Sequence, residues 1–187
     1  MGIDGACTVK LVRKNNGNAV KEFEDLTKYL NDLFAMVGKR IGCVNVREQE
    51  GYAECEATEE SVTITIRSEN DRNFFFHRCI SETVCHMQPI TEWSDLKWIP
   101  DGDHDWNGRM ATICKRYDCW MTLVGGWDSC CEYGVWKAMD NNGVIRSNVK
   151  LPWDKQSKKP DSPTPEEVAF NAAEAESLKM IEDFING

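Results

Sequence analysis

The stretch Trp106 to Trp136 holds four of the chain's nine cysteines and four of its seven tryptophans. Within it, Arg109 to Lys115 and Cys119 to Val124 are short runs rich in apolar, β-branched and aromatic residues, and Gly125-Gly126 follows the second run as a break. Such runs are typical of strands joined by tight turns. A third run, Cys131 to Trp136, alternates loosely between apolar and polar positions. We therefore expect an antiparallel sheet here, stapled through its cysteines.

The N-terminal part predicts a strand followed by a helix. Gly5 to Arg13 alternates as a strand does, and the Asn15 to Asn18 run breaks it. The spacing of apolar residues then changes to three and four, which is typical of a helix with one apolar stripe, and Gly38 would end that helix. The stripe residues are Val20, Phe23, Leu26, Leu30, Leu33, Phe34 and Val37.

More strands are expected between this helix and the cysteine-rich stretch. The candidates are Arg40 to Val46, Tyr52 to Ala57 and Ser61 to Arg67, the last of which alternates strictly so that Val62, Ile64 and Ile66 would face the core. A helix is expected over about residues 71 to 87, capped by Asn70 or Asp71. From Pro89 to Gly108 the sequence predicts a loop.

The composition changes sharply after Trp153. The run DKQSKKPDSPTP is polar and contains prolines, so it predicts a linker. Thr164, Pro165 and Glu167 then form a strong helix start. An acidic amphipathic helix should follow, with the apolar stripe Val168, Ala172, Ala175, Leu178, Ile181 and Phe184. We expect two units, residues 1 to 154 and residues 155 to 187. The apolar stripe of the second unit needs a partner, and self-association would supply one.

Length and charge exclude several classes of protein. A chain of 187 residues with 41% apolar content can bury a core within one domain. The net charge of -9 argues against nucleic acid as a partner, because phosphates need clustered lysines and arginines. No apolar run is long enough to span a membrane. The N-terminal residues do not show the cationic region followed by an apolar one that would predict a secretory signal. A secreted protein would therefore be represented here in its mature form.

Cysteine usage favours an oxidising compartment. Nine cysteines are many for a cytosolic protein of this length. Because nine is odd, one thiol stays free or pairs between chains, and the connectivity of the others is open. The disulfide candidates are Cys7, Cys43, Cys55, Cys79, Cys85, Cys114, Cys119, Cys130 and Cys131.

Metal binding is the alternative use of the cysteines. One candidate set consists of His77, Cys79, Cys85 and His86, which supply four nitrogen and sulfur ligands within ten residues, and a second consists of the four thiolates of Cys114, Cys119, Cys130 and Cys131. Neither set has the spacing of paired zinc knuckles. Disulfides and core thiols are the simpler interpretation, so we expect no cofactor. The acidic run Asp101 to Asp105 begins like a calcium loop, but it lacks the central glycine and the final glutamate, and a solvated turn is expected instead.

Catalysis has little support in the sequence. A cysteine nucleophile such as Cys119 would need a histidine partner, and no local motif gives one of the three histidines that role. Recognition is another hypothesis, because Trp93, Trp98 and Trp106 lie in loop-like sequence, where large aromatic residues often anchor a partner. Filling the open end of a sandwich is an equal alternative for these side chains.

The chain resembles the killer-toxin-like, necrosis-inducing effector domain of small secreted fungal proteins. The resemblance rests on Trp106-Asn107-Gly108-Arg109, on Cys114 or Cys119, on the closing strand Glu132 to Trp136, and on the turn Ser68 to Asp71. It covers about a third of residues 40 to 136, and the family's turn glycine is Glu69 here. It implies an α/β sandwich, secretion, a disulfide-stapled core and no enzymatic activity.

Together these patterns predict an α+β fold. An antiparallel sheet would carry one or two packed helices in a disulfide-stapled α/β sandwich, with a C-terminal amphipathic helix added. The leading hypothesis for function is a non-enzymatic secreted effector or toxin-like protein that binds a protein or cell-surface target. An intracellular zinc-stabilised interaction module, viral or regulatory, is the alternative, and an enzyme of unknown class is a third hypothesis.

Overall fold

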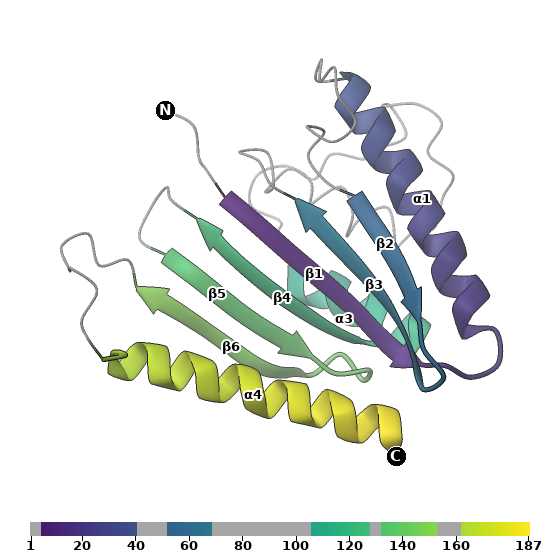
Figure 1. Ribbon diagram of the computed structural model, residues 1–187. Helices are drawn as coiled ribbons and strands as arrows, with labels where there is room; N and C mark the ends of the chain where they lie inside the picture. The colour runs from purple at the N-terminus through teal and green to yellow at the C-terminus, as the bar shows by residue number, and fades with distance from the viewer. Residues whose placement is uncertain (1–4, 41–51, 69–105, 128–131, 153–161) are drawn as a thin grey trace.

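The structure, a computed structural model, describes residues 5–40, 52–68, 106–127, 132–152 and 162–187 (Figure 1). These residues form an α+β fold with an open antiparallel sheet of six strands. The elements in chain order are β1 (Gly5–Lys14), α1 (Ala19–Arg40), β2 (Tyr52–Ala57), β3 (Ser61–Ser68), α3 (Trp106–Tyr117), β4 (Trp120–Trp127), β5 (Glu132–Met139), β6 (Ile145–Pro152) and α4 (Pro165–Asn186).

The first strand lies at the centre of the sheet. The strand order is β2-β3-β1-β4-β5-β6, and each neighbouring pair is antiparallel. Val9 lies opposite Ile66 in β3 and opposite Leu123 in β4. Because strands far apart in the sequence meet on β1, this strand joins the N-terminal and C-terminal halves of the sheet.

Helices cover the sheet from both sides. Val9 and Leu11 of β1 point to one face, where they pack in a common core with Phe23 of α1 and Ile113 of α3. Side chains alternate along a strand, so Lys14 points to the other face, and there its ammonium lies 5.4 Å from the ring centroid of Phe184 in α4. Figure 1 shows the same arrangement, with α3 behind the sheet and α4 in front of it. The fold thus has three layers.

Helix α1 confirms the first part of the apolar stripe predicted for it, and the side chains of Leu33, Phe34 and Val37 lie outside those described. Phe23, Leu26 and Leu30 are almost fully buried. The helix does not end at Gly38, however, but continues to Arg40. The side-chain amide of Asn31 donates to the carbonyl of Ala53 and accepts from its N–H, both at 2.9 Å. These bonds tie α1 to β2, an outer strand of the sheet as described.

The prediction of a strand over Arg109 to Lys115 is wrong, because these residues belong to α3. Its buried residues Met110, Ile113, Cys114 and Tyr117 follow one another at the three- and four-residue spacing of a helix face. The run is too short to separate this spacing from the alternation of a strand. The predicted loop is also wrong over its last residues, since α3 begins at Trp106.

Other strand predictions are confirmed with shifted ends. The strand predicted at Cys119 to Val124 is β4, but Gly125-Gly126 does not break it, because the strand continues to Trp127 and Gly126 pairs with Ala6 of β1. The run Cys131 to Trp136 lies in β5 from Glu132 onward. Strands β1, β2 and β3 confirm the three earlier runs. Sequence patterns did not indicate β6, whose IRSNVKLP run mixes polar and apolar residues.

The predicted C-terminal helix is present and capped as expected. Thr164 is the N-cap, its hydroxyl accepts from the N–H of Glu167, and the Glu167 carboxylate accepts from the N–H of Thr164. This capping box fixes the start of α4. The expected boundary between residues 154 and 155, the candidate strand from 41 onward and the expected helix over 71 to 87 lie outside the described residues.

Candidate functional site

Most of the predicted site residues lie outside the described part of the chain. Trp93 and Trp98 are among them, and so is the alternative zinc set His77, Cys79, Cys85 and His86. Trp106 begins α3, but its side chain is not described. Of the disulfide candidates, Cys43, Cys130 and Cys131 also fall outside, and Cys7 is placed in β1 by its backbone alone.

Three disulfide candidates are described, and all three are free thiols. Cys55 is half-buried in β2, while Cys114 and Cys119 are fully buried at the end of α3 and the start of β4. The expected staple is therefore absent from these three positions. Within the described ranges, no group of three or more histidine, cysteine, aspartate or glutamate residues could hold a metal ion.

The turn that ends α3 brings Cys114 and Cys119 together. Asp118 adopts φ of +49°, and the N–H of Cys119 donates to the carbonyl oxygen of Cys114 at 3.0 Å. A left-handed residue followed by this hydrogen bond is the Schellman ending of a helix, in which the two bonded residues commonly pack side chain to side chain. A hydrogen bond with the Cys114 thiol, together with burial, raises the pKa of Cys119 well above its ordinary value. The thiol of Cys119 is therefore protonated at neutral pH and a poor nucleophile.

Charged and aromatic residues surround this thiol pair. The side-chain amide of Asn141, beyond β5, donates to the carboxylate of Asp118 at 2.8 Å. The ring of Tyr117 meets that of Phe23 edge to face with centroids 6.2 Å apart, and burial raises the pKa of Tyr117. The guanidinium of Arg13 lies 5.5 Å from the Phe23 ring centroid and pairs with Glu22. The end of α3 thus contacts α1 and the β5–β6 turn, and Arg13 of β1 packs on the same α1 ring.

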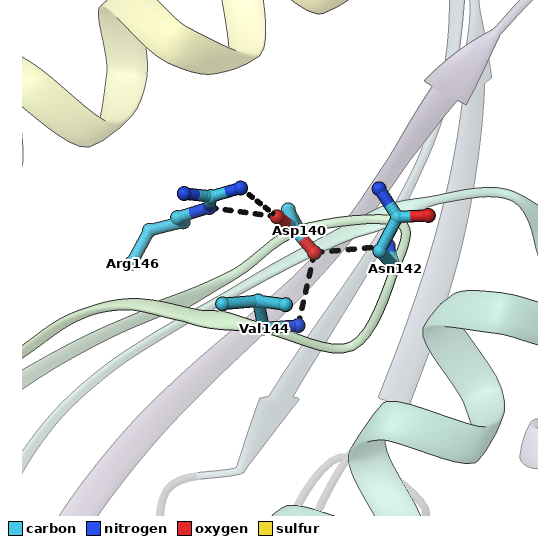
Figure 2. Close-up of polar contacts among 4 residues, drawn as sticks. All are labelled: Asp140, Asn142, Val144 and Arg146. Atoms are coloured by element: carbon cyan, nitrogen blue, oxygen red, sulfur yellow. Dashed lines mark hydrogen bonds and ion pairs between the residues drawn. The ribbon is translucent and has the colours of Figure 1, made fainter.

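The β5–β6 turn contains a buried carboxylate whose two oxygens are both used. Oδ1 of Asp140 accepts from the N–H groups of Asn142 and Val144, each at 2.9 Å, and Oδ2 accepts from Nε of Arg146 at 2.7 Å (Figure 2). A second Arg146 nitrogen lies 2.6 Å from Oδ2. Because every partner is local, this carboxylate stabilises the turn, and it is not positioned as a general base.

The same turn packs tightly on α3. Gly143 has φ of +76°, and a Cβ added to it would lie 2.7 Å from Cβ of Ala111. Glycine is required here both for the backbone conformation and for the close approach. The β5–β6 turn and α3 are therefore in direct contact at Gly143 and Ala111.

The other face of the sheet carries two tryptophans that α4 covers. Nε1 of Trp136 donates to the hydroxyl of Ser177 at 3.3 Å, and the ring of Trp120 lies 6.4 Å from that of Phe184, centroid to centroid. This interface also contains the buried Phe170 and Ile181. Nε1 of Trp120 is buried and finds no hydrogen-bond partner among the described residues. The interface is mainly apolar but incompletely satisfied.

The apolar stripe predicted for α4 divides between the two sides of the helix. Ile181 and Phe184 pack on the sheet, whereas Val168 and Leu178 are 53% and 49% exposed, with the exposed Ala172 and Ala175 between them. The sequence pattern indicated the sheet-facing side only in part. Phe170 and Ser177 lie buried on that side, but neither belongs to the predicted stripe. The spacing of Phe170, Ala173, Ser177 and Ile181 was the available signal.

No helix in the described ranges combines the length and apolar character needed to cross a bilayer. Comparison with known proteins found no matching family model, no matching curated protein and no matching solved structure.

Proposed function

We propose that this protein is a non-enzymatic binding protein of the secreted effector or toxin-like kind, which contacts a protein or cell-surface target through the outer side of α4. The resemblance of the closing segment to the killer-toxin-like, necrosis-inducing effector domain supports the class. Disulfides among the cysteines outside the described residues belong to the same proposal.

The observation that carries the proposal is the outward position of Val168 and Leu178. Large apolar side chains that stay half exposed on a docked helix are candidates for contact with a partner. The two lie ten residues apart, and exposed alanines between them extend the apolar stripe along the helix. A helix with such a stripe can lie in an apolar groove of a target.

The charge of α4 indicates what the target surface is like. The helix carries Glu166, Glu167, Glu174, Glu176, Glu182 and Asp183 against a single cation, Lys179. A complementary target would present an apolar groove with basic residues at its rim, and the association rate would then fall as the salt concentration rises.

The experiment that tests this proposal compares saturable binding of labelled protein to a panel of fungal, plant and animal cells. We expect unlabelled native protein to compete, and the double variant V168E/L178E to compete at least about tenfold less well. A control variant, A169E/N186E, adds the same two charges at other exposed positions of α4 and should compete normally. Equal competition by the two variants would remove the outer side of α4 as the contact surface.

A second candidate function is favoured by the free thiols. Cys55, Cys114 and Cys119 are all reduced in the structure, as they would be inside a cell. This observation supports the intracellular zinc-stabilised interaction module, whose ligands would come from His77, Cys79, Cys85 and His86. The two candidates differ in the oxidation state of the remaining cysteines and in zinc content, and both can be measured.

A further inference from the structure

We infer that Cys114 and Cys119 form a disulfide with each other when the chain folds under oxidising conditions, so that a covalent bond closes the Schellman turn between α3 and β4. The inference does not depend on the proposed function, because this thiol pair can be reduced or oxidised in a protein of any class. The inference rests on the geometry of Cys114 and Cys119 in the fold, and not on the number of cysteines in the chain.

The backbone geometry brings the two α-carbons within range of a disulfide. The path from Cα of Cys114 through its carbonyl oxygen and the 3.0 Å hydrogen bond to the nitrogen and Cα of Cys119 has a length of about 7 Å when fully extended. The bends at each atom shorten the direct separation below this limit. Disulfides join residues whose α-carbons are usually about 4.4 to 6.8 Å apart.

The side chains point toward each other as well. Both thiols are completely buried in the same apolar core, and the thiol of Cys119 makes a side-chain hydrogen bond with that of Cys114. The left-handed conformation of Asp118 and its bond from Asn141 hold the turn in the form that keeps the two residues adjacent. No large rearrangement is needed for the sulfur atoms to bond.

The reaction is a thiol–disulfide exchange with a small disulfide such as glutathione disulfide. One cysteine thiolate attacks the glutathione disulfide, which forms a mixed disulfide and releases one glutathione thiolate. The other cysteine then attacks the mixed disulfide, the Cys114–Cys119 bond forms, and a second glutathione thiolate leaves. The two cysteine protons end on the two glutathione molecules, which are reduced as the pair is oxidised. Because both thiols are buried, the exchange takes place before the turn closes during folding.

Once folding is complete, burial protects either form. The reduced pair is shielded from oxidants because both side chains are fully buried and the pKa of Cys119 is raised, and the oxidised pair is shielded from reductants by the same burial. The pair therefore records the redox conditions under which the chain folded.

The test maps this bond in the full-length native chain. The protein is unfolded, refolded in excess glutathione disulfide, unfolded again in denaturant that contains an alkylating agent, and then digested with trypsin and chymotrypsin. Trypsin cleaves after Lys115 and Arg116, and chymotrypsin cleaves after Tyr117 and Trp120, so that Cys119 is separated from Cys130 and Cys131. A sample reduced before alkylation is the control.

We expect a peptide pair in which residues 110–115 are linked to residues 118–120, about two mass units lighter than the sum of the reduced peptides, and absent from the control. Alkylated Cys114 and Cys119 in the oxidised sample, or a bond from either one to another cysteine, would overturn the inference.

Discussion

Nε1 of Trp136 in β5 donates a hydrogen bond to the hydroxyl of Ser177 in α4, 41 residues later in the sequence, over a distance of 3.3 Å. The same hydroxyl donates to the carbonyl oxygen of Ala173 at 2.8 Å. A small polar residue in the middle of the buried side of α4 thus satisfies a tryptophan of the sheet. This pair fixes the position of the helix along the strands.

Replacing Ser177 with alanine should therefore destabilise the protein by about 1 kcal/mol, because the buried indole N–H loses its acceptor while the helix gains a better helix former. Urea denaturation of S177A, W136F and the double variant measures the coupling between the two residues. Independent effects of the two substitutions would show that the hydrogen bond contributes nothing.

Deletion of residues 156–187 should leave the sheet and α1 folded. The main core cluster draws on α1, α3 and strands β1 to β5, whereas Trp120, Trp136, Phe170 and Ile181 form a separate contact under α4. Loss of Phe170 and Ile181 should cost about 1.5–3 kcal/mol each. We expect a lower thermal midpoint and weaker self-association in sedimentation experiments. Loss of cooperative unfolding in the truncated protein, without any change in association, would place α4 in the core.

Substitution of Asp140 tests the carboxylate of the β5–β6 turn. D140A should cost about 3 kcal/mol, because it leaves two backbone N–H groups and the Arg146 guanidinium without their acceptor. D140N keeps an oxygen for the two N–H groups and should cost less. Chemical denaturation measures the stability of both variants. Equal stabilities of D140A and D140N would contradict this assignment.

Glycines at two turns provide a matched pair. G143A should be destabilised by about 2–4 kcal/mol, since it combines a left-handed backbone with a Cβ clash against Ala111. G17A has a similar φ of +51° but open space around the added Cβ, so only about 1 kcal/mol is expected. The difference between the two unfolding free energies reports the packing of the turn on α3. Equal losses would mean that this contact is not tight.

Alkaline pH should lower the stability of the reduced protein. The pKa values of Cys55, Tyr117 and Cys119 are raised, mainly by burial for the first two and by the Cys114 hydrogen bond for the third. The folded state then holds these protons more tightly than the unfolded chain. Stability from these groups is complete below the ordinary values of 9.0 for cysteine and 10.0 for tyrosine, and is lost as the pH rises through the folded values.

Denaturant unfolding of the reduced protein at about pH 8 and about pH 10.5 measures this loss. The C119A variant lacks the most strongly raised group, so its stability should fall less over the same interval. The same fall in the variant and the native protein would show that Cys119 does not contribute.

Much of the fold could be predicted where the periodicity was long. The stripe from Phe23 to Leu30 and the alternation of Val62, Ile64 and Ile66 each repeat several times, and both correctly located an element and its core face. The short α3 was misassigned because its buried face, from Met110 to Tyr117, supplies only about two turns of pattern. The sequence did not indicate β6, because this strand depends on its pairing with β5 and its contacts with α4. Neither can be recognised from the residues of the strand alone.

The candidate site was less accessible from the sequence. Cys114 and Cys119 were recognised as candidates for disulfide formation, but their mutual contact depends on the left-handed Asp118, which has no strong sequence signal. Val168 and Leu178 were placed on a single stripe with Ile181 and Phe184. Only the docking of α4 on the sheet shows that this stripe divides into a buried and an exposed part.

The most direct test of the proposed class is the intact mass of the protein purified without reductant from a secreting host, together with its zinc content. A secreted effector should be at least about six mass units lighter than its reduced form, which corresponds to three disulfides, and should contain no zinc. Nine alkylatable thiols, or one zinc ion per chain, would contradict the effector assignment and favour the intracellular zinc module.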